Sequence, residues 1–202
     1  MYAQVAIKPN PLLRNGAYGI VMRGVQKCTR GCSSLRGRNK LPLCCIELDT
    51  ATDPACGTGG MLSVAEEYLH QLNASTELMA FGQEINDQTF AICKADMLIK
   101  GNNADFIKDG NTLSDDQFAG QTFDYILSNP PFGREWKNEK AAVEKEAKLG
   151  FAGRFGPGLP AASDGQMLFL LNGLTKLKPE GRMAIIQNGS SLFTGDAGSG
   201  QS

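Results

Sequence analysis

A polar and aromatic tetrapeptide, Asn129, Pro130, Pro131 and Phe132, directly follows the apolar stretch 122–128. The side-chain oxygen of Asn129 and the backbone oxygen of Pro130 are two acceptors that the rigid Pro-Pro pair holds in fixed geometry. Both can accept protons from one exocyclic amine and bias its nitrogen toward a nucleophilic geometry without a strong base. Phe132 offers a flat face, and stacking a base there is worth about 1 to 3 kcal/mol. The pattern predicts a site for the amino group of a planar substrate; the alternative is a stiffened turn with a buried Phe.

A glycine-rich loop, residues 53–61, contains Gly57, Gly59 and Gly60 ahead of a stretch with helical spacing. Glycines let backbone N–H groups approach a ligand closely, and the positive end of the following helix points at the same place. The G-x-G-x-x-G spacing of dinucleotide folds is not met, which counts against a nicotinamide cofactor. The loop therefore predicts a cofactor cradle, with an ordinary glycine turn as the alternative.

Two further polar residues stand at predicted strand ends. Glu84 closes the strand 78–85, where a carboxylate can accept two hydrogen bonds from ribose hydroxyls. Asn111 follows the short strand 104–110, and its side-chain carbonyl and amide could read the edge of an adenine ring. Taken singly, Glu84 could be a solvated acid and Asn111 a turn residue.

Strands and helices alternate along the chain from residue 44 onward. The expected strands lie at about 44–52, 78–85, 104–110, 122–128 and 182–188, and the expected helices at 61–72, 86–101 and from Ser163 or Asp164 to Pro179, with a polar insertion at 134–162. This order predicts an α/β fold with a parallel sheet covered by helices on both faces. Such sheets bind ligands at the carboxyl ends of their strands, where all the candidate residues fall.

Composition narrows the function classes. Residues 1–50 carry eight Lys/Arg and two acids, and residues 51–202 carry twelve and nineteen, so charge for binding nucleic acid must come from a partner, the N-terminal stretch or a local patch. No stretch is apolar enough to cross a membrane, and the first residues do not resemble a secretory signal, so a cytoplasmic location is expected. The six cysteines are irregularly spaced, which predicts free thiols and no metal site.

The glycine loop, the Glu84 strand end, the Asn-Pro-Pro-Phe tetrapeptide and residues 163–200 together resemble the modification subunit of type I restriction-modification systems. These subunits are S-adenosylmethionine-dependent N6-adenine DNA methyltransferases, and the resemblance implies a Rossmann-like methyltransferase sheet. It implies that a target adenine flipped out of the duplex is received by residues 129–132. It also implies that S-adenosylmethionine is bound by Asp53, Ala55, Gly57, Thr58, Gly59, Gly60, Glu84 and Asn111, with Asn111 in place of a more usual aspartate.

The resemblance covers residues 52–202 and leaves gaps at both ends. We therefore expect a poorly patterned basic segment at 1–45 and a partial catalytic domain at 46–202, incomplete at its C-terminal end. The implied partners are DNA and the specificity and restriction subunits of a type I complex. Two alternatives stay open, a protein glutamine N5-methyltransferase, whose motif is Asn-Pro-Pro-Tyr, and a remnant that at most binds cofactor. Phe132 in place of Tyr favours the DNA enzyme.

Overall fold

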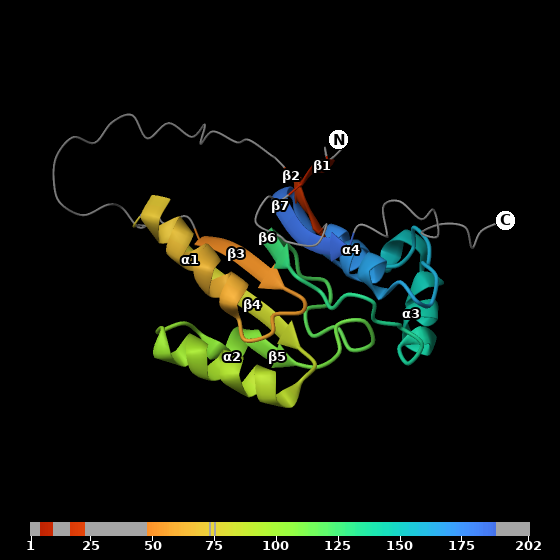
Figure 1. Ribbon diagram of the computed structural model, residues 1–202, viewed down its shortest axis with the longest axis horizontal. Coiled ribbons are helices and arrows are strands. Elements are labelled where there is room, and N and C mark those ends of the chain that lie inside the picture. The colour runs from red at the N-terminus through yellow and green to blue at the C-terminus, as the bar shows by residue number, and fades with distance from the viewer. Residues whose placement is uncertain (1–4, 10–16, 23–47, 73, 75, 189–202) are drawn as a thin grey trace.

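The computed structural model describes residues 5–9, 17–22, 48–72, 74 and 76–188. A seven-stranded sheet of order β1-β2-β7-β6-β3-β4-β5 forms its centre (Figure 1). The strands are β1 (Val5–Pro9), β2 (Ala17–Met22), β3 (Leu48–Asp53), β4 (Glu77–Glu84), β5 (Ile107–Asp109), β6 (Phe123–Ser128) and β7 (Leu177–Asn188). The helices are α1 (Gly60–Leu72), α2 (Asp87–Ile99), α3 (Lys140–Ala147) and α4 (Gly165–Lys176), with short 3-10 turns η2 (Ala104–Phe106) and η3 (Gly150–Ala152).

The five strands from β3 to β7 run parallel, as the alternation of strands and helices predicts. From the central strand β3 the chain builds β4 and β5 on one side, then crosses to build β6 and β7 on the other. At this switch the loops after β3 and β6 leave in opposite directions, which opens a crevice at the carboxyl ends of the two strands. The crevice lies where the sequence places the candidate residues.

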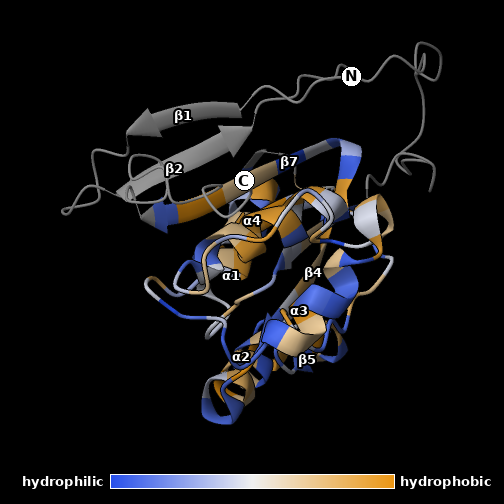
Figure 2. Ribbon diagram, turned by 90° about the vertical axis from the view of Figure 1, so that its right-hand side faces the viewer, coloured by the Kyte–Doolittle hydropathy of each residue, from blue (hydrophilic) through white to orange (hydrophobic). Residues whose placement is uncertain are grey.

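Helices cover both faces of the sheet, and neighbouring residues on one strand pack against helices on opposite faces. On β4, Ala80 packs into a cluster with α1 and α2, and Phe81 packs into a larger aromatic cluster with α4 and the segment around α3. Figure 1 shows α1 and α2 together at one end of the molecule and α3 and α4 at the other. Figure 2 shows α4 as a mostly hydrophobic helix beside β7, consistent with a helix buried against the sheet.

The sheet continues beyond β7 into the N-terminal part of the chain. β2 pairs antiparallel with β7, with Ala17 opposite Asn188, and β1 pairs antiparallel with β2. The sequence pattern of residues 1–45 predicts no strand, so this edge of the sheet is a departure from expectation. β1 and β2 share one sheet with the strands of the segment that follows. The expected domain boundary at residue 46 stays a prediction.

The observed end of α4 and the observed start of β7 differ from the boundaries predicted from the sequence. The helix expected to run to Pro179 ends at Lys176, and the strand expected from Arg182 begins at Leu177. The pairing jumps from Phe123 opposite Leu177 to Tyr125 opposite Arg182, so the residues between bulge out of the ladder. Pro179 lies in this bulge, where its missing N–H costs no ladder hydrogen bond. Asp164 is the N-cap of α4, as predicted, but its side chain makes no capping hydrogen bond.

The segment 134–162, expected as a polar insertion, is part of the core. It folds into α3 and η3, and Trp136, Val143 and Phe155 are almost fully buried in the aromatic cluster. The indole N–H of Trp136 donates to the backbone oxygen of Ala161 at 2.9 Å, which joins the two ends of the segment. This segment therefore positions the residues after β6 and is not a detachable loop.

Candidate functional site

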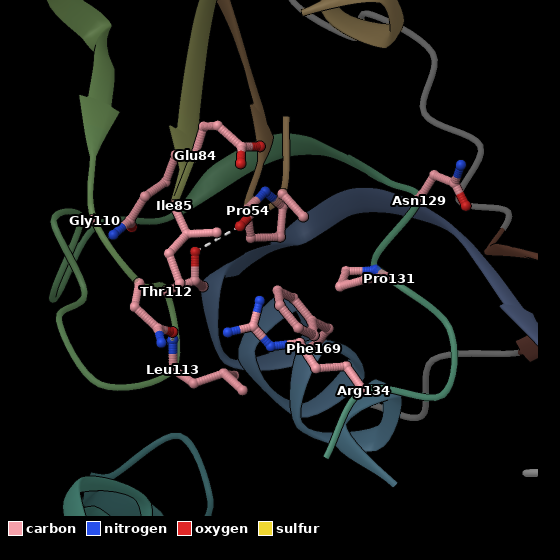
Figure 3. Close-up of a pocket in the computed structure, with 13 residues that line it drawn as sticks. Pro54, Glu84, Ile85, Gly110, Thr112, Leu113, Asn129, Pro131, Arg134 and Phe169 are labelled. Carbon is pink, nitrogen blue, oxygen red and sulfur yellow. Dashed lines mark hydrogen bonds between the residues drawn. The ribbon is translucent and has the colours of Figure 1, made fainter. Parts of the chain in front are cut away.

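A pocket of about 290 Å³ lies at the carboxyl ends of the parallel strands. Residues from the loops or strand ends after β3, β4, β5 and β6 line it, and Phe169 of α4 closes one side. Figure 3 shows Glu84 and Gly110 at one end, Asn129 and Pro131 at the other, and Arg134 beside Phe169 between them. One hollow therefore reaches some of the predicted cofactor residues and some of the residues predicted to receive the target base.

Glu84 ties the glycine loop to the end of β4. Its Oε2 accepts a hydrogen bond from the Gly57 N–H at 2.8 Å, and its Oε1 accepts one from the Asn86 N–H at 2.9 Å. Gly57 has φ +56°, in the left-handed region that favours glycine. A carboxylate has about four acceptor positions, so Glu84 can still accept two hydrogen bonds from a diol that enters the pocket. The two internal bonds fix its orientation for that role.

Gly59 approaches helix α2 and does not line the pocket. A Cβ at this position would lie 2.8 Å from Cys93 Sγ and 2.9 Å from Met97 Cε, and the φ of +83° disfavours any other residue. A side chain at this position would therefore meet helix α2. Gly60 begins α1, and a Cβ added there would meet no heavy atom within 4 Å, so it is not constrained in the same way.

Asp53 is buried at the end of β3, beneath the glycine loop. Burial raises the pKa of its carboxyl to about 7, although the hydrogen bond from the Ala55 N–H and the nearby Ser128 hydroxyl act to lower it. The hydrogen bond from Ala55, 3.0 Å long, sets the turn that leads from β3 into the loop. Asp53 does not line the pocket.

Both ends of the Asn111 side-chain amide are already engaged. Its Oδ1 accepts from the Leu113 N–H at 3.0 Å, and its Nδ2 donates to Glu139 Oε1 at 2.7 Å. The same Glu139 oxygen is 3.2 Å from Nη2 of Arg134. Asn111 and Arg134 line the pocket, whereas Glu139 does not.

In the tetrapeptide after β6, one residue is buried and three are exposed. Asn129 is exposed and makes no side-chain hydrogen bond with any described residue, so its amide oxygen is free to accept. Pro130 is buried, and Phe132 is 49% exposed. Phe132 thus departs from the alternative of a turn with a buried ring, and its face is available to a planar group. Gly133 follows with φ +64°, which reverses the chain.

Five of the predicted site residues line the pocket together: Ala55, Glu84, Asn111, Asn129 and Pro131. The others lie around it and outside its lining: Asp53, Gly57, Thr58, Gly59, Gly60, Pro130 and Phe132. The lining residues not expected from the sequence include Gln83, Thr112, Arg134 and Phe169. Gln83 and Arg134 stand one and two positions from residues that were singled out, so position beside a motif is the signal that could have found them. Phe169 has the sequence pattern of an ordinary helix-core residue.

Arg154 joins three parts of this site from within the core. Its guanidinium is bonded to Glu146 (2.6 Å), to the backbone oxygen of Thr112 (2.6 Å) and to Asn172 Oδ1 (3.1 Å). Burial disfavours the ionised form of Glu146, but the hydrogen bonds from Arg154 outweigh this and lower the pKa of Glu146. Arg154 therefore fixes the loop after β5 relative to α4 and the 134–162 segment.

Residues 46–200 match the N-6 DNA Methylase family. The chain belongs to this family. It is 27% identical over 146 residues to the type I restriction enzyme MjaIX methylase subunit of Methanocaldococcus jannaschii, covering 71% of this chain and 26% of that protein. The crystal structure of a type I restriction-modification system methyltransferase subunit from Streptococcus thermophilus is similar, with TM-score 0.60 and 29% identity over 72% of this chain and 30% of that one.

The fold is that of class I S-adenosylmethionine-dependent methyltransferases, as expected from the sequence. A Listeria monocytogenes protein described as a member of that class superposes with TM-score 0.57 at 18% identity, covering 74% of this chain and 42% of that one. The chain spans less than a third of the length of the type I methylase subunits it matches.

Two other expectations concern membrane spans and metal ligands. Within the described ranges, no helix combines the length and apolar character needed to cross a bilayer. Across the same residues, no group of three or more His, Cys, Asp or Glu is placed to hold a metal ion. Cys56 and Cys93 are free thiols with their sulfurs 4.0 Å apart, and the remaining cysteines lie outside the described residues.

Proposed function

We propose that this chain is the catalytic core of a type I DNA methyltransferase subunit that methylates adenine N6 with S-adenosylmethionine. The observation that carries the proposal is the single pocket that joins Glu84 and Asn111 to Asn129 and Pro131. A methyl donor held at one end and an amine held at the other would meet within it. Membership of the N-6 DNA Methylase family supports the same reaction.

The residues at the first end fit S-adenosylmethionine. Glu84 keeps acceptor positions for two ribose hydroxyls, and Asn111 offers an amide edge for the adenine. The positive end of α1 starts at Gly60, beside the glycine loop that would hold the methionine part of the cofactor. When bound, the cofactor supplies an electrophilic methyl group on a cationic sulfur.

The residues at the second end hold and orient the acceptor amine. Asn129 Oδ1 and the Pro130 carbonyl accept the two N6 protons of an adenine, and this draws the nitrogen lone pair out of conjugation with the ring. Phe132, half exposed, stacks on the base and retains it outside the duplex. The nitrogen forms its new bond to the methyl carbon as the donor bond breaks, and a proton then leaves to water.

DNA and the specificity and restriction subunits are the proposed partners. Residues 51–202 have an excess of acids, so this part of the chain has no net positive charge to attract phosphates. A specificity subunit that contributes most of the DNA contact would resolve this mismatch. The relatives are named as methylase subunits of type I restriction enzymes, which supports an assembly of this kind.

Single-turnover transfer of a labelled methyl group tests the proposal. The chain, alone and with its specificity subunit, is mixed with duplex DNA, with a glutamine-containing peptide, or with neither. We expect methylated adenine in the duplex arm when the specificity subunit is present, and Asn129→Ala should reduce that rate at least about a hundredfold while leaving cofactor affinity within about threefold. Methylation of the peptide would favour a glutamine methyltransferase, and cofactor binding without transfer in any arm would contradict the proposal.

A further inference from the structure

We infer that Glu139 is a positioning residue that locks the Asn111 amide in one orientation and so selects adenine over a base with the reversed hydrogen-bonding edge. The inference rests on the proposed function, because it concerns how the same pocket recognises the base of its cofactor. It assigns a role to a residue of the 134–162 segment that lies outside the pocket lining.

Two contacts fix the amide, and both favour the same orientation. Leu113 N–H donates to Oδ1 of Asn111 at 3.0 Å, and Nδ2 of Asn111 donates to Glu139 at 2.7 Å. A flipped amide would place its oxygen against a carboxylate and its NH2 group against an N–H donor. Both contacts would then be repulsive, so one orientation is strongly preferred.

The environment of Glu139 costs the fold stability, which indicates that this residue has another role. It is 4% exposed at the start of α3, and its Oε2 has no hydrogen-bond partner among the described residues. Burying a carboxylate with one unsatisfied oxygen costs stability. Within the described part of the chain, Arg134 is the one charged group in ion-pair contact with it, through Oε1 at 3.2 Å, and Arg134 is itself held at the pocket by this contact.

The fixed Asn111 amide keeps one defined set of hydrogen-bonding positions for a ligand. After its two internal bonds, Asn111 retains one acceptor position on Oδ1 and one proton on Nδ2. Adenine presents a donor at N6 beside an acceptor at N1, which matches this acceptor and donor pair. Hypoxanthine presents an acceptor at O6 beside a donor at N1, which would face like groups. The orientation of Asn111 thus decides which base the pocket accepts.

The same contact explains why an aspartate does not suit position 111 in this chain. Asn111→Asp would bring a second carboxylate oxygen to about the 2.7 Å that now separates Nδ2 from Glu139. Two ionised carboxylates at that distance in a buried site repel each other, and the repulsion is relieved when the pair binds a proton, which a lower pH favours. Asn111→Asp should therefore bind the adenine of the cofactor well only at low pH, or in combination with Glu139→Gln, whose amide can donate to the new carboxylate.

Calorimetry with S-adenosylhomocysteine tests this in the full chain. We expect Asn111→Asp to bind at least about tenfold more weakly than wild type at pH 8 and to recover toward pH 5.5, because like charges shift a pKa by about one unit or more. The double variant Asn111→Asp/Glu139→Gln should bind more tightly than Asn111→Asp at pH 8 and lose the pH dependence, although the aspartate still lacks the N–H that Asn111 offers to adenine N1. Glu144→Gln, on the same helix and paired with Lys140, is the matched control and should change neither property.

A second readout uses S-inosylhomocysteine, whose base is hypoxanthine. Wild type should prefer the adenosyl compound by at least about tenfold, and Glu139→Ala should reduce that preference at least about threefold by freeing one side of the amide, with thermal melting confirming that the variant folds. Equal affinity of wild type and Asn111→Asp at pH 8, or no rescue by the double variant in folded protein, would overturn the inference. If wild type binds neither compound, the proposed function fails instead.

Discussion

Gly57 and Glu84 are joined across 27 residues of sequence by a hydrogen bond of 2.8 Å from a backbone N–H to a carboxylate oxygen. The bond fastens the glycine loop to the end of β4. Because the other oxygen of Glu84 accepts from the Asn86 N–H, one side chain organises both the loop and the start of α2.

Glu84→Gln should weaken cofactor binding by about ten- to a hundredfold, because its NH2 group would face one of two N–H donors and leave it unsatisfied at a cost of about 1 to 3 kcal/mol. Calorimetry with S-adenosylhomocysteine measures the loss. Glu77→Gln, at the exposed other end of β4, is the control and should bind as wild type does. Unchanged affinity in Glu84→Gln would remove this residue from the cofactor site.

Gly59→Ala should lower the free energy of unfolding by about 1 to 3 kcal/mol, since its Cβ would overlap Cys93 Sγ at 2.8 Å in a left-handed backbone conformation. Gly60→Ala, with open space around it, should be within about 0.5 kcal/mol of wild type. Denaturant unfolding measures both. Adding Cys93→Ala to Gly59→Ala should recover part of the loss, and no recovery would mean that backbone strain or the contact with Met97 Cε is responsible.

Phe132→Ala should weaken retention of a flipped base by about 1 to 3 kcal/mol, and Phe132→Trp should recover much of that loss because any flat ring that fits can stack. A fluorescent adenine analogue at the target position, in the complex with the specificity subunit, reports the flipped state. Phe151→Ala removes a ring that is 91% exposed on the 134–162 segment but is not part of the pocket, and serves as control. Equal flipping in Phe132→Ala and wild type would refute the stacking role.

Asp53→Asn should raise stability at pH 8. The Asp53 carboxyl loses its proton near pH 4 when unfolded but near pH 7 when folded, so the wild-type protein loses stability between these values as pH rises. The loss is on the order of 4 kcal/mol for a shift of this size, and an asparagine, which has no proton to lose, avoids it. Melting temperatures of both proteins from pH 4 to 8 should diverge as pH rises; parallel curves would show that Asp53 is ionised without cost.

The sequence carries the information for the parallel sheet and for the strand ends because both depend on local patterns. Alternating apolar strands and helices, and polar residues such as Glu84 at the end of a strand, can be recognised within a few residues. No local pattern distinguishes Glu139, because it lies among many Lys and Glu residues. Its role depends on a contact with Asn111, which is 28 residues away in the sequence. The reason for Gly59 likewise lies in Cys93 on another element.

Arg154 gives the two ends of the pocket a common support. It holds the backbone of Thr112 and Leu113, beside the predicted adenine position, and belongs to the 134–162 segment that follows Phe132 and Gly133. Ordering of one end by its ligand would therefore lower the entropy cost of ordering the other. Cofactor and target base should consequently strengthen each other's binding by the same factor, as thermodynamic reciprocity requires.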